Sequence, residues 1–130
     1  MTDFLAKSEL NAGAYTPENL LAGDSDVITK PDSIAQAGAI ARLTVMGRVT
    51  GSGLLIQSVR TANDGSQNPV AILVEGVDTT AAAVTAPVYV AGEFLMDALN
   101  WHASWDTEAR RLAAFGDRAP IVVKKSGFNG

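Results

Sequence analysis

The chain has 130 residues, no cysteine and a formal net charge of −4. This length suits one domain with a modest core, because 21 of the residues are alanines, which fill little volume. The lack of cysteine excludes disulfides, thiolate metal sites and a cysteine nucleophile. No stretch approaches the roughly 20 apolar residues that span a bilayer, and the first residues lack a signal-peptide pattern. We therefore expect a soluble protein that is synthesised in a cytoplasm.

The negative charge is concentrated at the beginning of the chain. Residues 1–32 carry a net charge of −4, whereas residues 33–130 are neutral overall. Binding to phosphate groups is driven by lysine and arginine side chains that release counterions. We therefore expect no direct nucleic-acid partner and no membrane partner.

Residues 1–32 read as an extended N-terminal arm ahead of a β-rich domain that covers residues 33–130. Gly13, Pro17, Gly23 and Pro31 interrupt any regular element in this arm. Its apolar content is nevertheless higher than that of a solvated linker. Two interpretations follow: the arm packs on its own domain, or it becomes ordered on a partner by adding a strand to a sheet edge.

Alternation and turn residues predict the first strands of the domain. From 41 to 49, apolar residues alternate with Arg42, Thr44 and Arg48, which is typical of a half-buried strand. A turn at residues 51–53 then leads into a second strand at residues 54–59. The residues Asn63-Asp64-Gly65-Ser66 favour a tight turn at which this strand folds back.

Two short apolar runs, Val70–Val74 and Pro87–Ala91, form the expected centre of the fold. Their residues are apolar at consecutive positions, as expected for strands that are covered on both faces. Asp78-Thr79-Thr80 opens the connection between the two runs.

One helix is expected after Ser104, with Ser104 or Asp106 as its cap and Gly116 as its end. Its apolar stripe comprises Trp105, Ala109, Leu112, Ala113 and Gly116. A last strand follows at residues 119–123, and Pro120 places the start of that strand at a sheet edge. The sequence thus predicts a mainly β fold with one short α-helix, in a small barrel or sandwich-like domain.

The sequence offers little catalytic chemistry. His102 is the single histidine, so no pair of imidazoles is available to bind a metal ion. It lies between Trp101 and Trp105, where a packed or surface histidine is the expected role. The Gly51-Ser52-Gly53 segment lacks the lysine of a phosphate-binding loop. We assign no catalytic, cofactor-binding or metal-binding residue and expect no enzyme activity.

Five ordered blocks of the sequence carry a family resemblance: residues 15–24 (YTPENLLAGD), 42–50 (RLTVMGRVT), 62–66 with 69–73 (ANDGS, PVAIL), 78–82 (DTTAA) and 88–94 (VYVAGEF). Together they resemble the head decoration proteins of tailed bacteriophages, the lambda decoration protein D family, over about Tyr15 to Ile121. The chain departs from the family pattern at Leu43, because the family usually has glycine at this position.

The resemblance implies a non-enzymatic virion protein with a small β-clip or partial-barrel fold. Such a protein binds as a homotrimer to the outer surface of the expanded head, contacts the major capsid protein, and stabilises the head against the pressure of packaged DNA. On this interpretation the capsid-binding residues of the arm are Phe4, Leu5, Tyr15, Thr16, Pro17, Leu20 and Leu21. The candidate residues for the trimer contact or the core are Val70, Ile72, Val88, Tyr89, Val90 and Phe94.

One alternative function from a different class stays open on sequence alone. A glycan-binding or host-surface-binding β module of a phage structural protein needs exposed aromatic side chains that stack on sugars. Trp101 and Trp105 are the plausible pair for that role.

Overall fold

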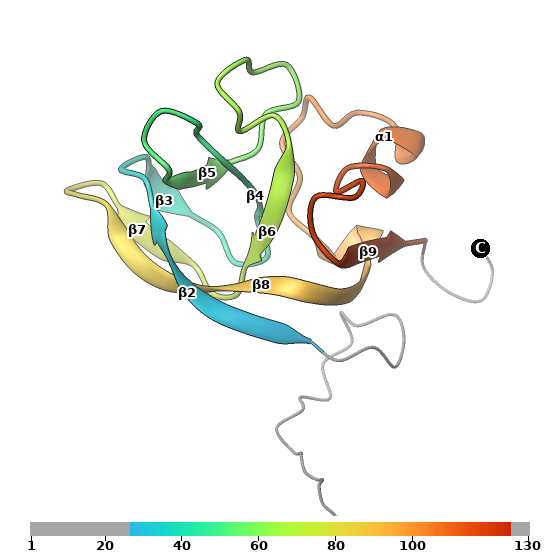
Figure 1. The fold of residues 1–130 in the computed structure, drawn as a ribbon, viewed down its shortest axis with the longest axis horizontal. Coiled ribbons are helices and arrows are strands. Elements are labelled where there is room, and N and C mark those ends of the chain that lie inside the picture. The colour runs from blue at the N-terminus through green and yellow to red at the C-terminus, as the bar shows by residue number, and fades with distance from the viewer. Residues whose placement is uncertain (1–26, 126–130) are drawn as a thin grey trace, which may run out of the picture.

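The computed structural model of the chain describes residues 27–125, and Figure 1 shows the arrangement of its elements. The elements in chain order are β2 (Ile28–Ile34), β3 (Gly38–Ile40), β4 (Val45–Arg48), β5 (Leu55–Gln57), β6 (Pro69–Leu73), β7 (Val77–Thr79), β8 (Val84–Leu95), a 3-10 helix η1 (Met96–Ala98), α1 (Glu108–Leu112) and β9 (Ile121–Lys124). No helix among these residues is long and apolar enough to cross a membrane.

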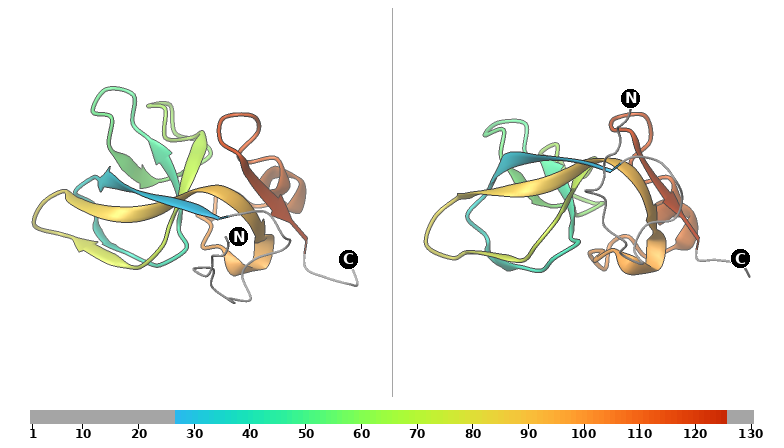
Figure 2. Two further views of the ribbon diagram at one scale, coloured as in Figure 1. Left: turned by 60° about the horizontal axis from the view of Figure 1, so that its bottom comes forward. Right: turned by 90° about the horizontal axis from the view of Figure 1, so that it is seen from below.

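Six of the strands form one sheet that nearly closes on itself. The strand order is β2-β5-β4-β6-β8-β9, and β2 also pairs with β8 along its whole length. Because β2 contacts both β5 and β8, the first five strands of this order curve into a small partial barrel (Figures 1 and 2). The prediction of a mainly β fold with one short helix and a partial barrel is confirmed.

A second, two-stranded sheet consists of β3 and β7. Thr79 is fully buried in it, and its hydroxyl group donates a hydrogen bond to the carbonyl oxygen of Gly38 at 2.9 Å. The hydroxyl oxygen of Thr79 also accepts from the backbone N–H of Ala37 at 2.7 Å. Part of the predicted 78–80 connection is therefore a paired strand. The Thr79 hydroxyl group links β7 to the start of β3 through these two hydrogen bonds.

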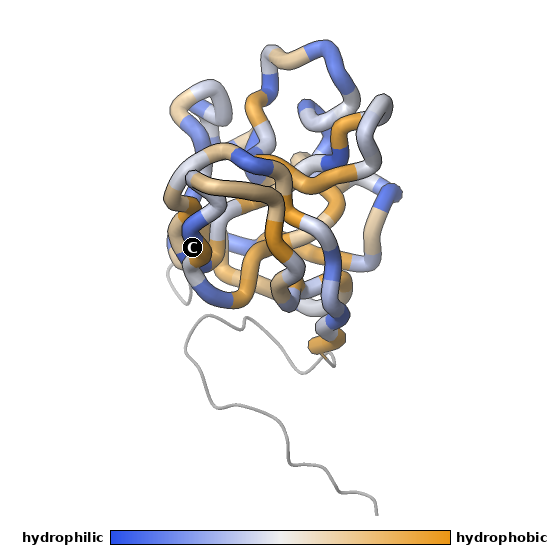
Figure 3. Tube along the Cα trace, turned by 90° about the vertical axis from the view of Figure 1, so that its left-hand side faces the viewer, coloured by the Kyte–Doolittle hydropathy of each residue, from blue (hydrophilic) through white to orange (hydrophobic). Residues whose placement is uncertain are grey.

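β4 and β6 separate two hydrophobic cores. Val45 and Ile72 point into the larger core, which also contains Phe94, whereas Met46 and Leu73 belong to the smaller one. Apolar segments accordingly run through the interior, and hydrophilic segments lie in the peripheral loops (Figure 3).

The predicted strand at residues 41–49 is confirmed as β4, but the prediction that it is half-buried is wrong. Residues 43–47 are all buried, because β4 lies between β5 and β6 with a core on each face. Thr44 is buried as well, and its hydroxyl group donates to the carbonyl oxygen of Ala41 at 2.7 Å. The hydroxyl oxygen of Thr44 also accepts from the side-chain amide of Asn100 at 2.8 Å. An alternating pattern predicts that its polar residues are exposed, whereas hydrogen bonds satisfy Thr44 inside the protein.

The two apolar runs are confirmed as strands, but the turn before the first run has a different role from the predicted one. β6 pairs with β4 and not with β5, so the chain crosses to the far edge of β4 between β5 and β6. Asp64 organises this crossing, since its Oδ1 accepts from the backbone N–H of Ser66 at 3.0 Å. A Cβ atom on Gly47 would lie 2.0 Å from the Ser66 carbonyl oxygen, so the loop requires glycine in β4.

The helix is shorter than predicted, and neither Ser104 nor Asp106 caps it. It begins after Thr107, whose hydroxyl oxygen accepts from the backbone N–H of Arg110 at 3.2 Å. Ser104 has other partners, because its hydroxyl oxygen accepts from the backbone N–H of Arg60 at 2.8 Å. The core holds Trp105 in place, and its indole N–H donates to the carbonyl oxygen of Ser58 at 3.1 Å.

The last strand is confirmed at the predicted place. β9 pairs in parallel with β8, with Gly92 opposite Ile121, and it ends the sheet order after Pro120. Ile121 and Val123 point into the larger core, whereas Val122 is exposed.

Candidate functional site

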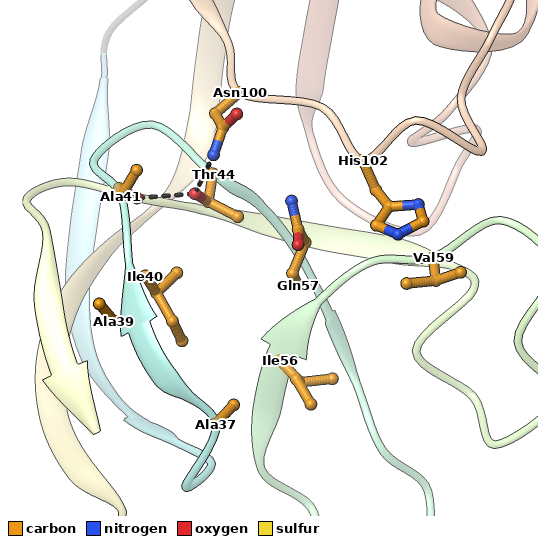
Figure 4. A pocket seen from close by; sticks show the side chains of 10 residues that line it. All are labelled: Ala37, Ala39, Ile40, Ala41, Thr44, Ile56, Gln57, Val59, Asn100 and His102. Carbon is orange, nitrogen blue, oxygen red and sulfur yellow. Dashed lines mark hydrogen bonds between the residues drawn. The ribbon is translucent and has the colours of Figure 1, made fainter. Parts of the chain in front are cut away.

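A pocket of about 400 Å³ lies between β3 and β5 (Figure 4). Its apolar walls carry alanine, isoleucine and valine side chains, and its polar groups come from Thr44, Gln57, Asn100 and His102. No acidic or basic side chain other than His102 lines it. The full lining comprises Ala37, Ala39, Ile40, Ala41, Thr44, Ile56, Gln57, Val59, Asn100 and His102.

The pocket lacks the groups that a hydrolytic site needs. His102 is tied into a local turn, since its Nδ1 accepts from the backbone N–H of Ser104 at 3.0 Å. The Ser104 hydroxyl group lies 2.9 Å from the same nitrogen and also accepts from Arg60. No carboxylate stands behind the imidazole to orient it as a general base within this lining. Among residues 27–125, no three metal-binding side chains gather.

The two tryptophans do not form an exposed stacking platform. Trp105 is 5% exposed, and its ring lies 5.9 Å from that of Trp101 at an angle of 55°. Trp101 is half-buried, and its indole N–H donates to the carbonyl oxygen of Met96 at 3.0 Å. The guanidinium group of Arg111 lies over the Trp101 ring at 5.8 Å. A glycan-binding module therefore loses its best candidate residues.

The residues predicted to contact the capsid protein lie outside the described part of the chain. These residues are Phe4, Leu5, Tyr15, Thr16, Pro17, Leu20 and Leu21. The predicted arm also included residues 28–32, and these form most of β2, which pairs with β8.

The residues predicted for the trimer contact or the core fall into two groups. Ile72, Val88 and Phe94 are fully buried within this chain. Val70, Tyr89 and Val90 are half-buried, and the Tyr89 ring packs 5.2 Å from the Phe94 ring. The first group lies in the core of this chain, and the second retains exposed surface.

Sequence reasoning missed the two exposed large apolar side chains among residues 27–125, Ile28 (53% exposed) and Val122 (46%). Their strands meet β8 two residues apart, because Ile28 is paired with Ala91 and Val122 with Glu93. Exposed apolar side chains of this kind are typical of surfaces that bind other proteins when they occur together. Ile121-Val122-Val123 are all apolar, so the sequence contains no signal that Val122 is the exposed member.

One ion pair dominates the electrostatics near the start of the described chain. Arg48 Nη2 lies 2.8 Å from Asp32 Oδ2, and Arg48 Nη1 donates to Asp32 Oδ1 at 3.2 Å. The hydrogen bond from Arg48 lowers the pKa of the Asp32 carboxyl group below its ordinary value, against the effect of burial. This pair joins β2 to β4, which are separated by β5 in the sheet order.

Comparison with known families identifies the family of this chain. The family model described as bacteriophage lambda head decoration protein D matches residues 9–121. The chain belongs to this family. No curated protein gives a significant match to the sequence.

Membership in the head decoration protein D family confirms the resemblance found in the sequence blocks and extends it toward the N-terminus, to residue 9. Head decoration proteins are structural proteins of the phage capsid, so the chain is a virion component. This role agrees with a pocket that can hold a small group but offers no reactive constellation.

Proposed function

We propose that this chain is a capsid cement protein. It is synthesised in the host cytoplasm, binds as a homotrimer to the outer surface of the expanded phage head, and stabilises the shell against the pressure of packaged DNA. The observation that carries this proposal is the match to the head decoration protein D family over residues 9–121. The partners are the major capsid protein and two further copies of the chain.

The capsid contact is assigned to the N-terminal arm. Its candidate residues are Phe4, Leu5, Tyr15, Thr16, Pro17, Leu20 and Leu21. Support comes from the apolar residues of this segment, which are unusual in an acidic and breaker-rich stretch. An extended segment can add a strand to the edge of a sheet in the capsid protein, where main-chain hydrogen bonds supply affinity.

The trimer contact is assigned to the β domain. Val70, Tyr89 and Val90 are half-buried and can lose further surface on assembly. Ile28 and Val122 support a contact around residues 91–93 of β8, because both are large, apolar and exposed. A small core with many alanines gains stability when such side chains are buried between copies.

The test is the removal of residues 1–26, which leaves β2 complete because that strand begins at Ile28. We expect the truncated protein to stay folded, as measured by circular dichroism and thermal unfolding, and to lose binding to undecorated expanded heads in co-sedimentation. The full chain serves as the positive control. Full head binding by the truncated protein would overturn the assignment to the arm, and failure of the full chain to bind would overturn the cement function.

A further inference from the structure

Within residues 27–125, β2 has one edge that no other strand covers over most of its length. It pairs with β8 from Ile28 to Ile34, whereas on its other side only Ile34 meets β5 within residues 27–125. Figure 2 shows β2 lying along β8 at the outside of the barrel. An uncovered strand edge is a template on which another chain can add a strand.

Two hydrogen bonds, one on the far side of β8 and one between β2 and β5, establish which residues of β2 direct their main-chain groups to this outer edge. The carbonyl oxygen of Pro87 accepts from the backbone N–H of Val74, so the main-chain groups of Pro87 point away from β2. Its partner Pro31 therefore points away from β8, because both groups of a residue in an antiparallel pair lie on one side. On the same side, the N–H of Ala35 donates to the carbonyl oxygen of Leu55 at 2.8 Å.

The outward positions are thus Thr29, Pro31 and Ser33, and the last two offer no free donor. Pro31 has no N–H group. The N–H of Ser33 donates to Asp32 Oδ1 at 2.8 Å, within its own strand. Arg48 holds that carboxylate through two contacts and also donates to the carbonyl oxygen of Gly53 at 2.9 Å. The side chain that covers the Ser33 donor is therefore fixed in place.

We propose that Pro31 and Asp32 close the outer edge of β2 to strand addition by another chain, in particular by β2 of a second copy. A strand added in register needs a donor at every second residue of the edge, and two successive donors are removed here. Thr29 is the remaining outward donor, so main-chain pairing with a partner ends before Pro31. The closed edge follows from the main-chain donors of β2 alone, so it is independent of the proposed binding to the phage head.

Both prolines fit the ladder without the loss of a β2–β8 hydrogen bond. Pro31 and Pro87 face each other at a position where neither strand donates to the other. Replacing Pro31 with threonine restores a donor at the outer edge, whereas replacing Pro87 restores one on the opposite side of β8. Pro87→Thr is therefore the matched control for the loss of a proline from this ribbon.

The test compares the self-association of the full-length chain and its variants by sedimentation velocity over a concentration series. Pro31→Thr combined with Asp32→Ala frees both donors, and we expect this double variant to associate beyond the native state at about tenfold lower concentration than the native chain. Asp32→Asn keeps an oxygen for the Ser33 N–H, and Pro87→Thr leaves the edge unchanged, so both should match the native chain.

The outcomes separate edge closure from a general loss of stability. Thermal unfolding of each variant shows whether it folds. If Asp32→Ala unfolds the chain, the self-association of the single variant Pro31→Thr tests the proposal, because this substitution disturbs no ion pair. No gain in association by a folded variant with a restored donor would overturn the proposal. Equal association by Pro87→Thr would also overturn it, and association by Asp32→Asn would overturn the role given to the Asp32 oxygen.

Discussion

Leu43 combines a buried side chain with a backbone conformation that favours glycine. Its φ is 61°, which makes it the one non-glycine residue with positive φ in residues 27–125, and it is 5% exposed. The left-handed conformation costs about 1–2 kcal/mol for a residue with a Cβ atom. Loss of a buried leucine side chain costs about 2–5 kcal/mol. Leu43 therefore stabilises the fold through its contacts in the larger core despite the strain.

This balance predicts an unusual order of stability at position 43. Leu43→Ala loses the side-chain contacts and keeps the strain, whereas Leu43→Gly loses the contacts and relieves the strain. We expect the glycine variant to be more stable than the alanine variant by about 1 kcal/mol, with both below the native chain in urea unfolding. Leu73, buried in strand β6, is the control. At that position the alanine variant should be more stable than the glycine variant by about 0.5–1 kcal/mol. The same order at both positions would contradict the strain at Leu43.

Asp32 gives the stability of the fold a defined pH dependence. Its pKa is lower in the folded chain because Arg48 donates hydrogen bonds to the charged carboxylate. Such a group stabilises the fold above its ordinary pKa, and this contribution disappears as the pH falls through the lower pKa of the folded state. We expect Asp32→Asn to be less stable than the native chain at neutral pH and to approach it in acid.

The measurement is the free energy of unfolding from neutral pH down into the acid range. Asp106→Asn is the matched control, because the pKa of Asp106 is also lowered by a hydrogen bond from Arg110. That pair is exposed to solvent, which screens it, so its removal should change the pH dependence less. A constant difference between Asp32→Asn and the native chain at all pH values would argue against the ion pair as the cause.

At the scale of elements, β2 is the first strand that the structure describes, and it is part of the six-stranded sheet. Ile28–Ile34 pair with β8, and Ile34 is completely buried. We expect a chain that starts at residue 27 to unfold with the native midpoint. A chain that starts at residue 33 should be clearly less stable, because it lacks most of the ladder and the Asp32–Arg48 pair. Thermal unfolding compares the two truncations, and equal midpoints would mean that β2 adds nothing to the domain.

The elements that the sequence predicted well are those with strong local signals. The apolar runs at β6 and β8, the turn at residues 51–53 and the last strand each follow from composition over a few residues. The strand order could not be predicted, because the same turn residues at 63–66 serve a hairpin or a crossing over β4. The length of the helix was also missed, since the burial of Trp105 and the hydrogen bonds of Ser104 depend on distant residues.

For the site, the sequence identified the family and therefore the kind of function, but not the exposed surface. Ile28 falls in a stretch read as arm, and Val122 lies in a strand whose outer face the sequence does not reveal. Surface contacts depend on which strands meet at β8, and this information arises only when the sheet is assembled. The burial of Ile72, Val88 and Phe94 was, in contrast, expected from their apolar runs.

At the scale of the whole molecule, the proposed trimer would present three arms and should bind a shell far more tightly than one arm does. Once one arm is bound, the others are held near their sites at a high effective concentration. We therefore expect a synthetic peptide of residues 1–26 to displace the full chain from expanded heads only at concentrations at least about 100-fold higher than those of the full chain as competitor. The control is the same peptide with alanine at Tyr15, Leu20 and Leu21, which should not compete. Displacement by the native peptide at the concentration of the full chain would show that single arms suffice and that trimer formation adds no affinity.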